Sequence, residues 1–282
     1  MYSLIVENVK GDKLQLTSNP DYEVTRIEGL NPPPANLNQT ANSTVDGSKI
    51  NSKKVESRNI VIYIKPNNDV EKNRIKLYSF FSTSMEVTLH FKNSSRNVYI
   101  SGVVETCELC HFDFPQMMQV SIICPDPYFN DVKETKMEFS NVIPAFEFPF
   151  SIPSEGIEFT SYLINNRKSL LNESDVNTSI VIELYASGVV KNPVIYDITH
   201  NKHIKLNMEL QYKDTITIDT NIKKMSISLQ REGETSNILG YMQPDSDWFI
   251  VTPGDNVFAY DCDEGVSNLH ISFKIPVKYG GV

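Results

Sequence analysis

A chain of 282 residues, 40% of them hydrophobic, can bury one large core or two ordinary ones, which excludes disorder of the whole chain. The net charge is −9 and no Lys/Arg cluster exceeds Lys53-Lys54 or Lys223-Lys224, so we expect no specific nucleic-acid binding. No apolar run approaches the roughly 20 residues that cross a bilayer, and the first residues lack the pattern of a signal peptide. We therefore expect no membrane insertion, and synthesis in the cytoplasm.

The N-terminal segment is predicted to be β-rich, with a break at a proline run. Residues 2–6, 13–16 and 24–27 are typical of short strands, and Gly11 supplies a turn between the first two. Leu30 then precedes Pro32, Pro33 and Pro34, which cannot donate hydrogen bonds to a sheet and force an extended path. Any strand pairing beyond this point must therefore begin afresh.

A polar segment from residue 36 to residue 59 is consistent with two structures. Its Asn/Ser/Thr-rich sequence is typical of a disordered loop. Its alternating apolar residues around Asp46-Gly47 favour instead a two-stranded ribbon, from about residue 30 to 58, with this dipeptide at the tip. Such a ribbon is marginal alone and would need a neighbouring subunit to stabilise it. The residues expected in this intersubunit arm are Leu30, Pro32, Pro33, Asp46, Gly47 and Arg58.

A helix is predicted after the strand at residues 58–64. Asn68 can cap it and Glu71 lies at the capping-box spacing, so the helix should run from about residue 70 to 81. We interpret its aromatic residues Tyr78, Phe80 and Phe81 as core packing against a sheet rather than as a ligand pocket.

A domain boundary is predicted near residue 132. Strands expected at residues 86–91, 98–104 and 118–124 complete a first block, after which Pro125 and Pro127 interrupt sheet pairing. Residues 130–133 are interpreted as a linker to a strand that begins near Thr135. We therefore predict an N-terminal domain of residues 1–132 and a C-terminal domain of residues 133–282.

The second block is predicted to be a β-sandwich. Short alternating strands, separated by turn residues and almost without helical periodicity, are typical of that architecture. The chain as a whole is therefore predicted to be mainly β with one short helix. The strands expected in this block are residues 157–162, 179–185, 194–198, 204–206, 215–218, 225–229, 248–251, 257–260 and 269–273.

Several residue patterns partly match known catalytic or metal sites, and none of them favours catalysis. Cys107, Cys110 and His111 spell a haem-attachment or zinc pattern, but no export signal accompanies it and a fourth zinc ligand would have to come from Cys124 or a distant histidine. If the strand from residue 98 continues, Cys107 and Cys110 also point to opposite faces. The acidic pairs near residues 245–247 and 261–264 do not complete a calcium loop, and no Gly-x-Ser-x-Gly elbow is present. We therefore expect that the protein is not an enzyme and that it binds neither a metal nor a cofactor.

The order of these features resembles the distal tail proteins (Dit) of long-tailed phages. The resemblance covers most of the chain and rests on the order and spacing of short motifs at residues 30–33, 46–47, 58–60, 77–78, 101–105, 124–129, 192–195, 214–220, 246–248 and 253–256.

This resemblance implies a structural tail protein rather than an enzyme. The N-terminal domains would form a ring, usually hexameric and either single or stacked, below the tail tube, with a central channel for DNA. The C-terminal domain would be a galectin-like sandwich that resembles a carbohydrate-binding module. The implied partners are the chain itself, the tail tube protein, and tail-tip and receptor-binding proteins, and the implied location is the virion tail tip.

An alternative function is binding of host cell-wall glycan through the C-terminal domain. Sandwich domains can present aromatic rings that stack on sugars, and Tyr241, Trp248 and Tyr260 lie close together in sequence. Core packing remains the favoured interpretation of Trp248. Glycoside hydrolysis, which needs two carboxylates at a catalytic separation, ranks last.

Overall fold

The structure is a computed structural model, and it describes residues 2–41, 46–109, 111–112, 114–139, 143–144, 160–161 and 167–282. The chain divides into two compact units. Unit 1 comprises residues 1–132 and 278–282, and unit 2 comprises residues 133–277. The last five residues therefore belong with the first unit, whereas the sequence placed them in the second.

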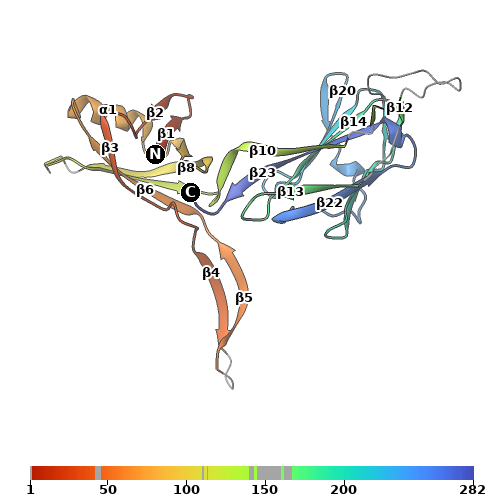
Figure 1. The fold of residues 1–282 in the computed structure, drawn as a ribbon, viewed down its shortest axis with the longest axis horizontal. Coiled ribbons are helices and arrows are strands. Elements are labelled where there is room, and N and C mark those ends of the chain that lie inside the picture. The colour runs from red at the N-terminus through yellow and green to blue at the C-terminus, as the bar shows by residue number, and fades with distance from the viewer. Residues whose placement is uncertain are drawn as a thin grey trace, which may run out of the picture. The chain divides into compact units, whose positions relative to one another are not determined.

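Unit 1 is built from antiparallel strands and one helix (Figure 1). One run of neighbouring strands is β2-β1-β7-β8 and another is β8-β9-β6-β3, while β10 also pairs with β8. The elements are β1 (Ser3–Asn8), β2 (Lys13–Gln15), β3 (Tyr22–Glu28), β4 (Ala35–Ala41), β5 (Ser48–Val55), β6 (Arg58–Pro66), α1 (Val70–Phe80), β7 (Glu86–Lys92), β8 (Asn97–Leu109), β9 (Met118–Cys124) and β10 (Phe129–Phe139).

Strand β8 belongs to both runs because it changes partners along its length. Its first half pairs with β7, and from Val103 onward it pairs with β9. Gly102 lies at the change: a Cβ there would sit 2.7 Å from the backbone oxygen of Ile123, so only glycine allows the strands to approach so closely. The inward side chains of both runs then fill one core, which includes Leu4, Ile62 and Leu89.

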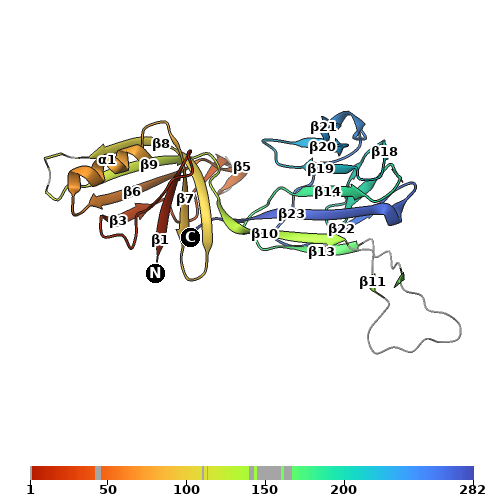
Figure 2. The ribbon, with the colours of Figure 1, turned by 90° about the horizontal axis from the view of Figure 1, so that it is seen from above.

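Helix α1 packs on this core, as the sequence predicted, and contacts β1 and β6 (Figure 2). Its Leu77 and Phe80 are buried. The predicted N-cap was wrong by one residue. Asp69 is the cap, and its carboxylate accepts a hydrogen bond from the backbone N–H of Lys72. Asn68 instead adopts a left-handed conformation with φ +54° and donates to the carboxylate of Asp21.

Unit 2 contains two layers of strands around a second core (Figure 1). One layer has the order β23-β14-β19-β20-β21 and the other β13-β22-β16-β17. Its elements after β10 are β11 (Ile143–Pro144), β12 (Thr160–Ser161), β13 (Arg167–Asn172), β14 (Val181–Ala186), β15 (Val190–Lys191), β16 (Val194–Asp197), β17 (Lys202–Lys205), β18 (Glu209–Leu210), β19 (Thr215–Asp219), β20 (Ser226–Arg231), β21 (Glu234–Asn237), η1 (Leu239–Tyr241), β22 (Gly254–Asp261), η2 (Val266–Asn268) and β23 (Leu269–Tyr279).

Aromatic rings join the two layers of unit 2. Phe258 on β22 stacks against Phe273 on β23, with ring centroids 4.9 Å apart and planes 26° from parallel. Phe139, at the end of β10, meets Phe273 edge-on at 5.4 Å. The mainly-β class with one short α-helix is thus confirmed.

Two local predictions differ from the structure. Residues 130–133 form part of the continuous strand β10 and are not a linker, because this strand can pair with β8 directly after the two prolines. Residues 248–251 form no strand; only Val251 makes an isolated bridge, to Thr178. The strand expected at 157–162 lies mostly outside the described residues. Among the described residues, no helix is long and apolar enough to cross a bilayer.

The separate cores generate a prediction about stability. Phe273 is fully buried in unit 2 and Phe91 in unit 1, and the two cores share no residue. We expect Phe273→Ala to lower the free energy of unfolding of unit 2 by about 3–5 kcal/mol, because it leaves a cavity. Hydrogen exchange under mild urea should show protection lost in residues 167–277. Phe91→Ala should instead lower the protection of unit 1. An equal loss of protection in both units for either variant would contradict separate cores.

Candidate functional site

The most distinctive feature of unit 1 is the hairpin of β4 and β5, here called the arm. It forms a two-stranded sheet that pairs with no other described strand, and it projects from the ends of β3 and β6 (Figure 1). The pairing runs from Ala35 opposite Val55 to Ala41 opposite Ser48, with a bulge next to Asn38. The ribbon that the sequence favoured over a disordered loop is therefore present, with Asp46 and Gly47 beyond the last paired residues.

The arm has no core of its own. Every residue of β4 and β5 is exposed except Val55, which is half-buried, and the apolar side chains of Leu37 and Ile50 are 43% and 54% exposed. Cross-strand side-chain hydrogen bonds hold it, including Ser48 Oγ to Gln39 Oε1 at 2.8 Å. Each strand is paired on one side only, so two backbone edges remain available within the described chain.

The arm is also basic, in contrast to the chain as a whole. Within residues 35–55 there are three lysines, Lys49, Lys53 and Lys54, against the single acid Asp46. The whole chain carries a net charge of −9. An exposed basic ribbon on an acidic protein is electrostatically complementary to another copy of the same chain.

The base of the arm is organised around the buried guanidinium of Arg58. Its Nε donates to the carbonyl of Pro127 at 2.6 Å and its Nη2 to that of Gly280 at 2.5 Å. Its Nη1 donates to the carbonyls of Gly29 and Asn31, and the Asn31 distance is 2.8 Å. We call this arrangement the Arg58 site. Four carbonyl groups from three separate segments therefore converge on one side chain.

The charge of Arg58 is stabilised without a carboxylate partner among the described residues. Its side chain is 4% exposed, and its Cζ lies 4.5 Å from the centroid of the Phe129 ring, a cation–π contact. Burial lowers the pKa of the guanidinium from its ordinary value, but arginine remains protonated in proteins. The carbonyl dipoles and the aromatic ring therefore compensate for the water that Arg58 has lost.

Neighbouring contacts fix the same region. Gly29 has φ +84°, and a Cβ there would lie 2.2 Å from the carbonyl oxygen of Asn59, which only glycine avoids. The C-terminal residues are held by Lys278, whose Nζ is 2.7 Å from Asp126, and by the backbone N–H of Val282, which donates to Leu30. The two ends of the arm are thus anchored to the boundary segment and to the last residues.

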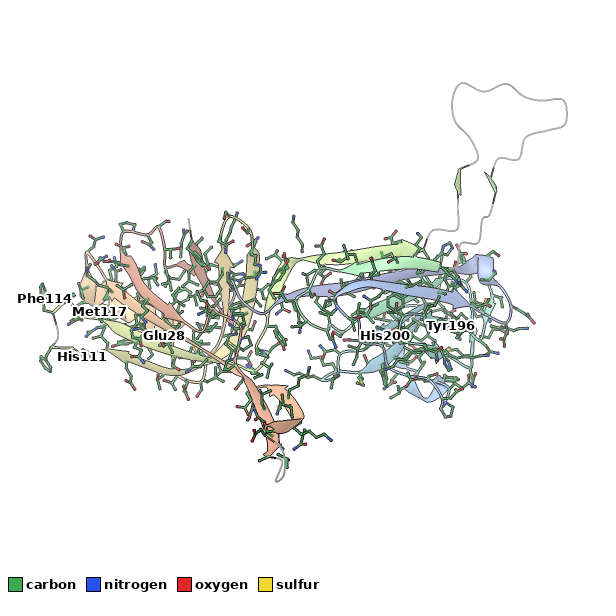
Figure 3. The ribbon with its side chains drawn as sticks, turned by 60° about the horizontal axis from the view of Figure 1, so that its bottom comes forward. Glu28, His111, Phe114, Met117, Tyr196 and His200 are labelled. Carbon is green, nitrogen blue, oxygen red and sulfur yellow. The ribbon has the colours of Figure 1, made fainter. Side chains whose placement is uncertain are left out.

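A groove lies beside the arm's base, along strand β3. This strand pairs only with β6 among the described strands, so its other edge is unpaired. The groove has a volume of about 690 Å³, and its apolar lining includes Val24, Ile27 and Leu30. Glu28, labelled in Figure 3, lies at its rim and forms an ion pair with Arg26 at 2.9 Å. An unpaired strand edge next to an apolar groove can accept an added strand.

The six residues predicted for the arm lie in two places, the far end of the arm and its base. Asp46 and Gly47 lie at the far end, whereas Leu30 and Pro33 are half-buried at the base and Pro32 is exposed there. Arg58 faces inward, so it positions the arm and contributes nothing to the arm's exposed surface. Gly29 was not among the predicted residues, although a glycine three residues before a proline run was an available signal.

A second exposed feature was not predicted. Phe112 and Phe114, in the turn between β8 and β9, are fully exposed, at 103% and 102% (Figure 3 labels Phe114). These two apolar rings, next to Pro115, contribute nothing to the core of unit 1.

The cysteine pattern in this region does not form a metal cluster among the described residues. Cys110 lies outside them. His111 accepts a hydrogen bond from Arg74 at 2.6 Å, which occupies one of its ring nitrogens. Cys107 is half-buried, and its Sγ lies 3.7 Å from the sulfur of Met118.

The three aromatic residues considered for glycan stacking do not form one site. Tyr260 is 1% exposed within the core of unit 2, so its ring is inaccessible. Trp248 is half-buried against that core, in agreement with the core-packing interpretation. Tyr241 is 52% exposed but lines a different hollow, beside Arg231 and Asn237. Proximity in sequence failed here because the three residues lie in different elements. Tyr241 belongs to η1, Trp248 lies in the loop before β22, and Tyr260 is on β22, where alternation along the strand turns its ring inward.

The Arg58 site should be essential for the stability of unit 1. Arg58→Met leaves carbonyl groups without their donor, so we expect a loss of about 2–4 kcal/mol in the free energy of unfolding of this unit, measured by urea denaturation. Arg58→Lys should recover only part of the lost free energy of unfolding, because an ammonium group lacks the planar set of N–H donors that bonds four carbonyls.

The matched control is Arg26→Met, which removes an arginine whose side chain is 69% exposed and should change stability by less than about 0.5 kcal/mol. Equal stability of Arg58→Met and Arg26→Met would contradict the assigned role.

The described thiols should react slowly in the folded protein. Burial raises the pKa of Cys107 to about 11, that of Cys124 to about 12 and that of Cys262 to about 11, so each thiolate is scarce near pH 8. In a Cys110→Ser variant, Ellman's reagent should react with these thiols slowly until denaturant is added. A rapid stoichiometric reaction in the native state would show that they are accessible.

Comparisons with known proteins agree with this architecture. Residues 173–275 match the family model described as siphovirus-type tail component, C-terminal domain. Among curated proteins none matches the chain. The crystal structure of phage SPP1 Dit, described as a paradigm of the hub adsorption apparatus in phages that infect Gram-positive bacteria, has 13% identity and a TM-score of 0.70, with 99% of each chain covered.

The baseplate of phage P2 in its activated conformation contains similar chains. The calcium form gives 12% identity and a TM-score of 0.58, and the strontium form 12% and 0.57, each with 100% of both chains covered. These identities are too low to transfer function, but the full coverage shows that the fold is shared from end to end. Residues 173–275 thus match the siphovirus-type tail component model, and the whole chain has the fold of the Dit proteins, in agreement with the resemblance found in the sequence.

Proposed function

We propose that this chain is a structural hub of a phage or prophage-derived tail, located at the tail tip, and that it assembles into a ring through the arm of unit 1. The observation that carries the proposal is the arm itself, a ribbon without a core whose backbone edges are unpaired in the single chain. Isolated two-stranded hairpins are marginally stable in water, so a partner surface is needed to stabilise this one.

A second copy of the chain is the partner that fits best. The edge of β3 and its adjacent groove offer unpaired backbone groups together with apolar side chains. Contact between the arm of one copy and β3 of the next joins two different surfaces, and such heterologous contacts form a ring when the rotation between copies closes. The charges agree, because the arm is basic and the chain as a whole is acidic.

The remaining parts of the proposal follow from the family resemblance. The ring would be hexameric, single or stacked, with unit 1 (residues 1–132 and 278–282) forming the belt and unit 2 (residues 133–277) as a galectin-like domain outside it. The tail tube, tail-tip and receptor-binding proteins would attach to this hub, and exposed Phe112 and Phe114 offer one docking point. An acidic channel would let DNA pass without binding it. In this role the protein catalyses no reaction.

The arm provides the direct test of assembly. Deletion of residues 35–54, closed by a short turn, should leave a folded monomer, because the arm contributes no side chain to either core. Light scattering and negative-stain imaging of the intact chain should show a ring of about six copies of 32.0 kDa. A ring that persists after the deletion would contradict the proposal.

A point variant on the arm, with a matched control, provides a second test of ring assembly. Ile50→Asp places a charge on the arm, and we expect it to weaken ring formation about tenfold or more, because a carboxylate must then be buried in the contact. Ile75→Asp alters an isoleucine on α1 that is similarly exposed, 61% against 54% for Ile50. The control should assemble like the intact chain, and equal impairment of both variants would point to a nonspecific effect.

A further inference from the structure

The outer face of one sheet in unit 2 carries a row of side chains that the hub function does not require. The strand register places Arg167 opposite Ala259, Ala259 opposite Tyr196, and Tyr196 opposite His203. Residues directly opposite one another in antiparallel strands share a face, so these four form a continuous row across β13, β22, β16 and β17. Tyr196 is 41% exposed, so the row faces solvent (Figure 3).

The row contains a hollow because its second member is small. Ala259 contributes only a methyl group between Arg167 and the ring of Tyr196, and the space above it has a volume of about 300 Å³. Ile198, Asn201 and Lys202, from the turn between β16 and β17, complete the lining. This volume is at the lower end of the range for small-molecule sites and suits a single ring-sized group.

The tyrosine ring is positioned before any ligand binds. The ring of His203 lies beside it, with centroids 6.4 Å apart and planes 40° from parallel. His203 is in turn 3.7 Å from the carboxylate of Asp245. A ring packed in this way loses little side-chain freedom when a ligand stacks on it.

The charges around the hollow favour an anion. Within the described residues, neither Arg167 nor Lys202 has an ion-pair partner, and the side-chain amide of Asn201 makes no hydrogen bond. The one acid in the lining, Asp197, is 1% exposed. Its carboxylate accepts hydrogen bonds from Nδ1 of His200 at 2.7 Å and from the backbone N–H of the same residue at 3.1 Å. Exposed Arg167 and half-buried Lys202 therefore leave two positive charges at the hollow, whereas the carboxylate of Asp197 is buried and already hydrogen-bonded.

We propose that this hollow binds one residue of an anionic glycan. A pyranose has an apolar face of C–H groups and a rim of hydroxyls, which match the apolar surface of Tyr196, Ile198 and Ala259 and the polar group of Asn201. The acid group of the sugar, a carboxylate or a phosphate, pairs with Arg167 and Lys202 through charge-assisted hydrogen bonds. Binding at this hollow does not require ring assembly, so this proposal can be tested independently of the hub function.

The experiment is calorimetric titration of the full-length chain with acidic and neutral sugars. The probes are tetragalacturonate against its methyl ester, and glucose 1-phosphate against glucose, so that the carboxylate and phosphate forms are tested separately. We expect at least one acidic probe to bind more tightly than its neutral partner. Tyr196→Ala and Arg167→Gln should each weaken that binding about tenfold, through loss of stacking and of the charged hydrogen bond.

Tyr185→Ala is the matched control. Tyr185 is 39% exposed on the other sheet of unit 2, and its ring lies beside that of His270 at 5.9 Å and 40°. Its substitution should leave binding unchanged. The proposal is overturned if neither acidic probe binds up to about 10 mM, which corresponds to a very weak site. It is also overturned if Tyr196→Ala binds like the intact chain, or if Tyr185→Ala weakens binding equally.

Discussion

The architecture of unit 1 depends on the guanidinium of Arg58. It joins the segment that enters the arm, at Gly29 and Asn31, to Pro127 near the boundary and to Gly280 close to the C-terminus. A buried cation is costly unless every donor has a partner, and five N–H donors in one plane can satisfy several carbonyls at once. The interaction therefore fixes where the arm begins and ends, although the arm has no core of its own.

The rest of unit 1 gives this site a rigid surrounding. Strand β8 passes from one run of strands to the other where Gly102 permits close approach to β9, so a single core serves both. The contrast between this packed body and the exposed ribbon of β4 and β5 is the physical reason for proposing assembly. The body satisfies its own backbone groups, whereas the arm leaves edges that another chain can pair with.

Unit 2 shows how a sandwich can combine stability with an available surface. Phe258 and Phe273 hold its layers together from the inside. On β16 and β22 the alternate side chains face outward, which places Tyr196 and the small Ala259 on the outer face. The same alternation directs Tyr260 into the core, so Ala259 and Tyr260, adjacent on β22, lie on opposite faces of the sheet.

Local sequence patterns were enough to predict the strand-rich class, the helix near residues 70–81, the break at the prolines and the ribbon with Asp46-Gly47 near its tip. These follow from local periodicity, turn chemistry and the missing N–H of proline. The inward orientation of Arg58, the burial of Tyr260 and the common face of Arg167 and Tyr196 became visible only in the folded chain. These facts depend on the register between strands far apart in the chain, which no local pattern specifies.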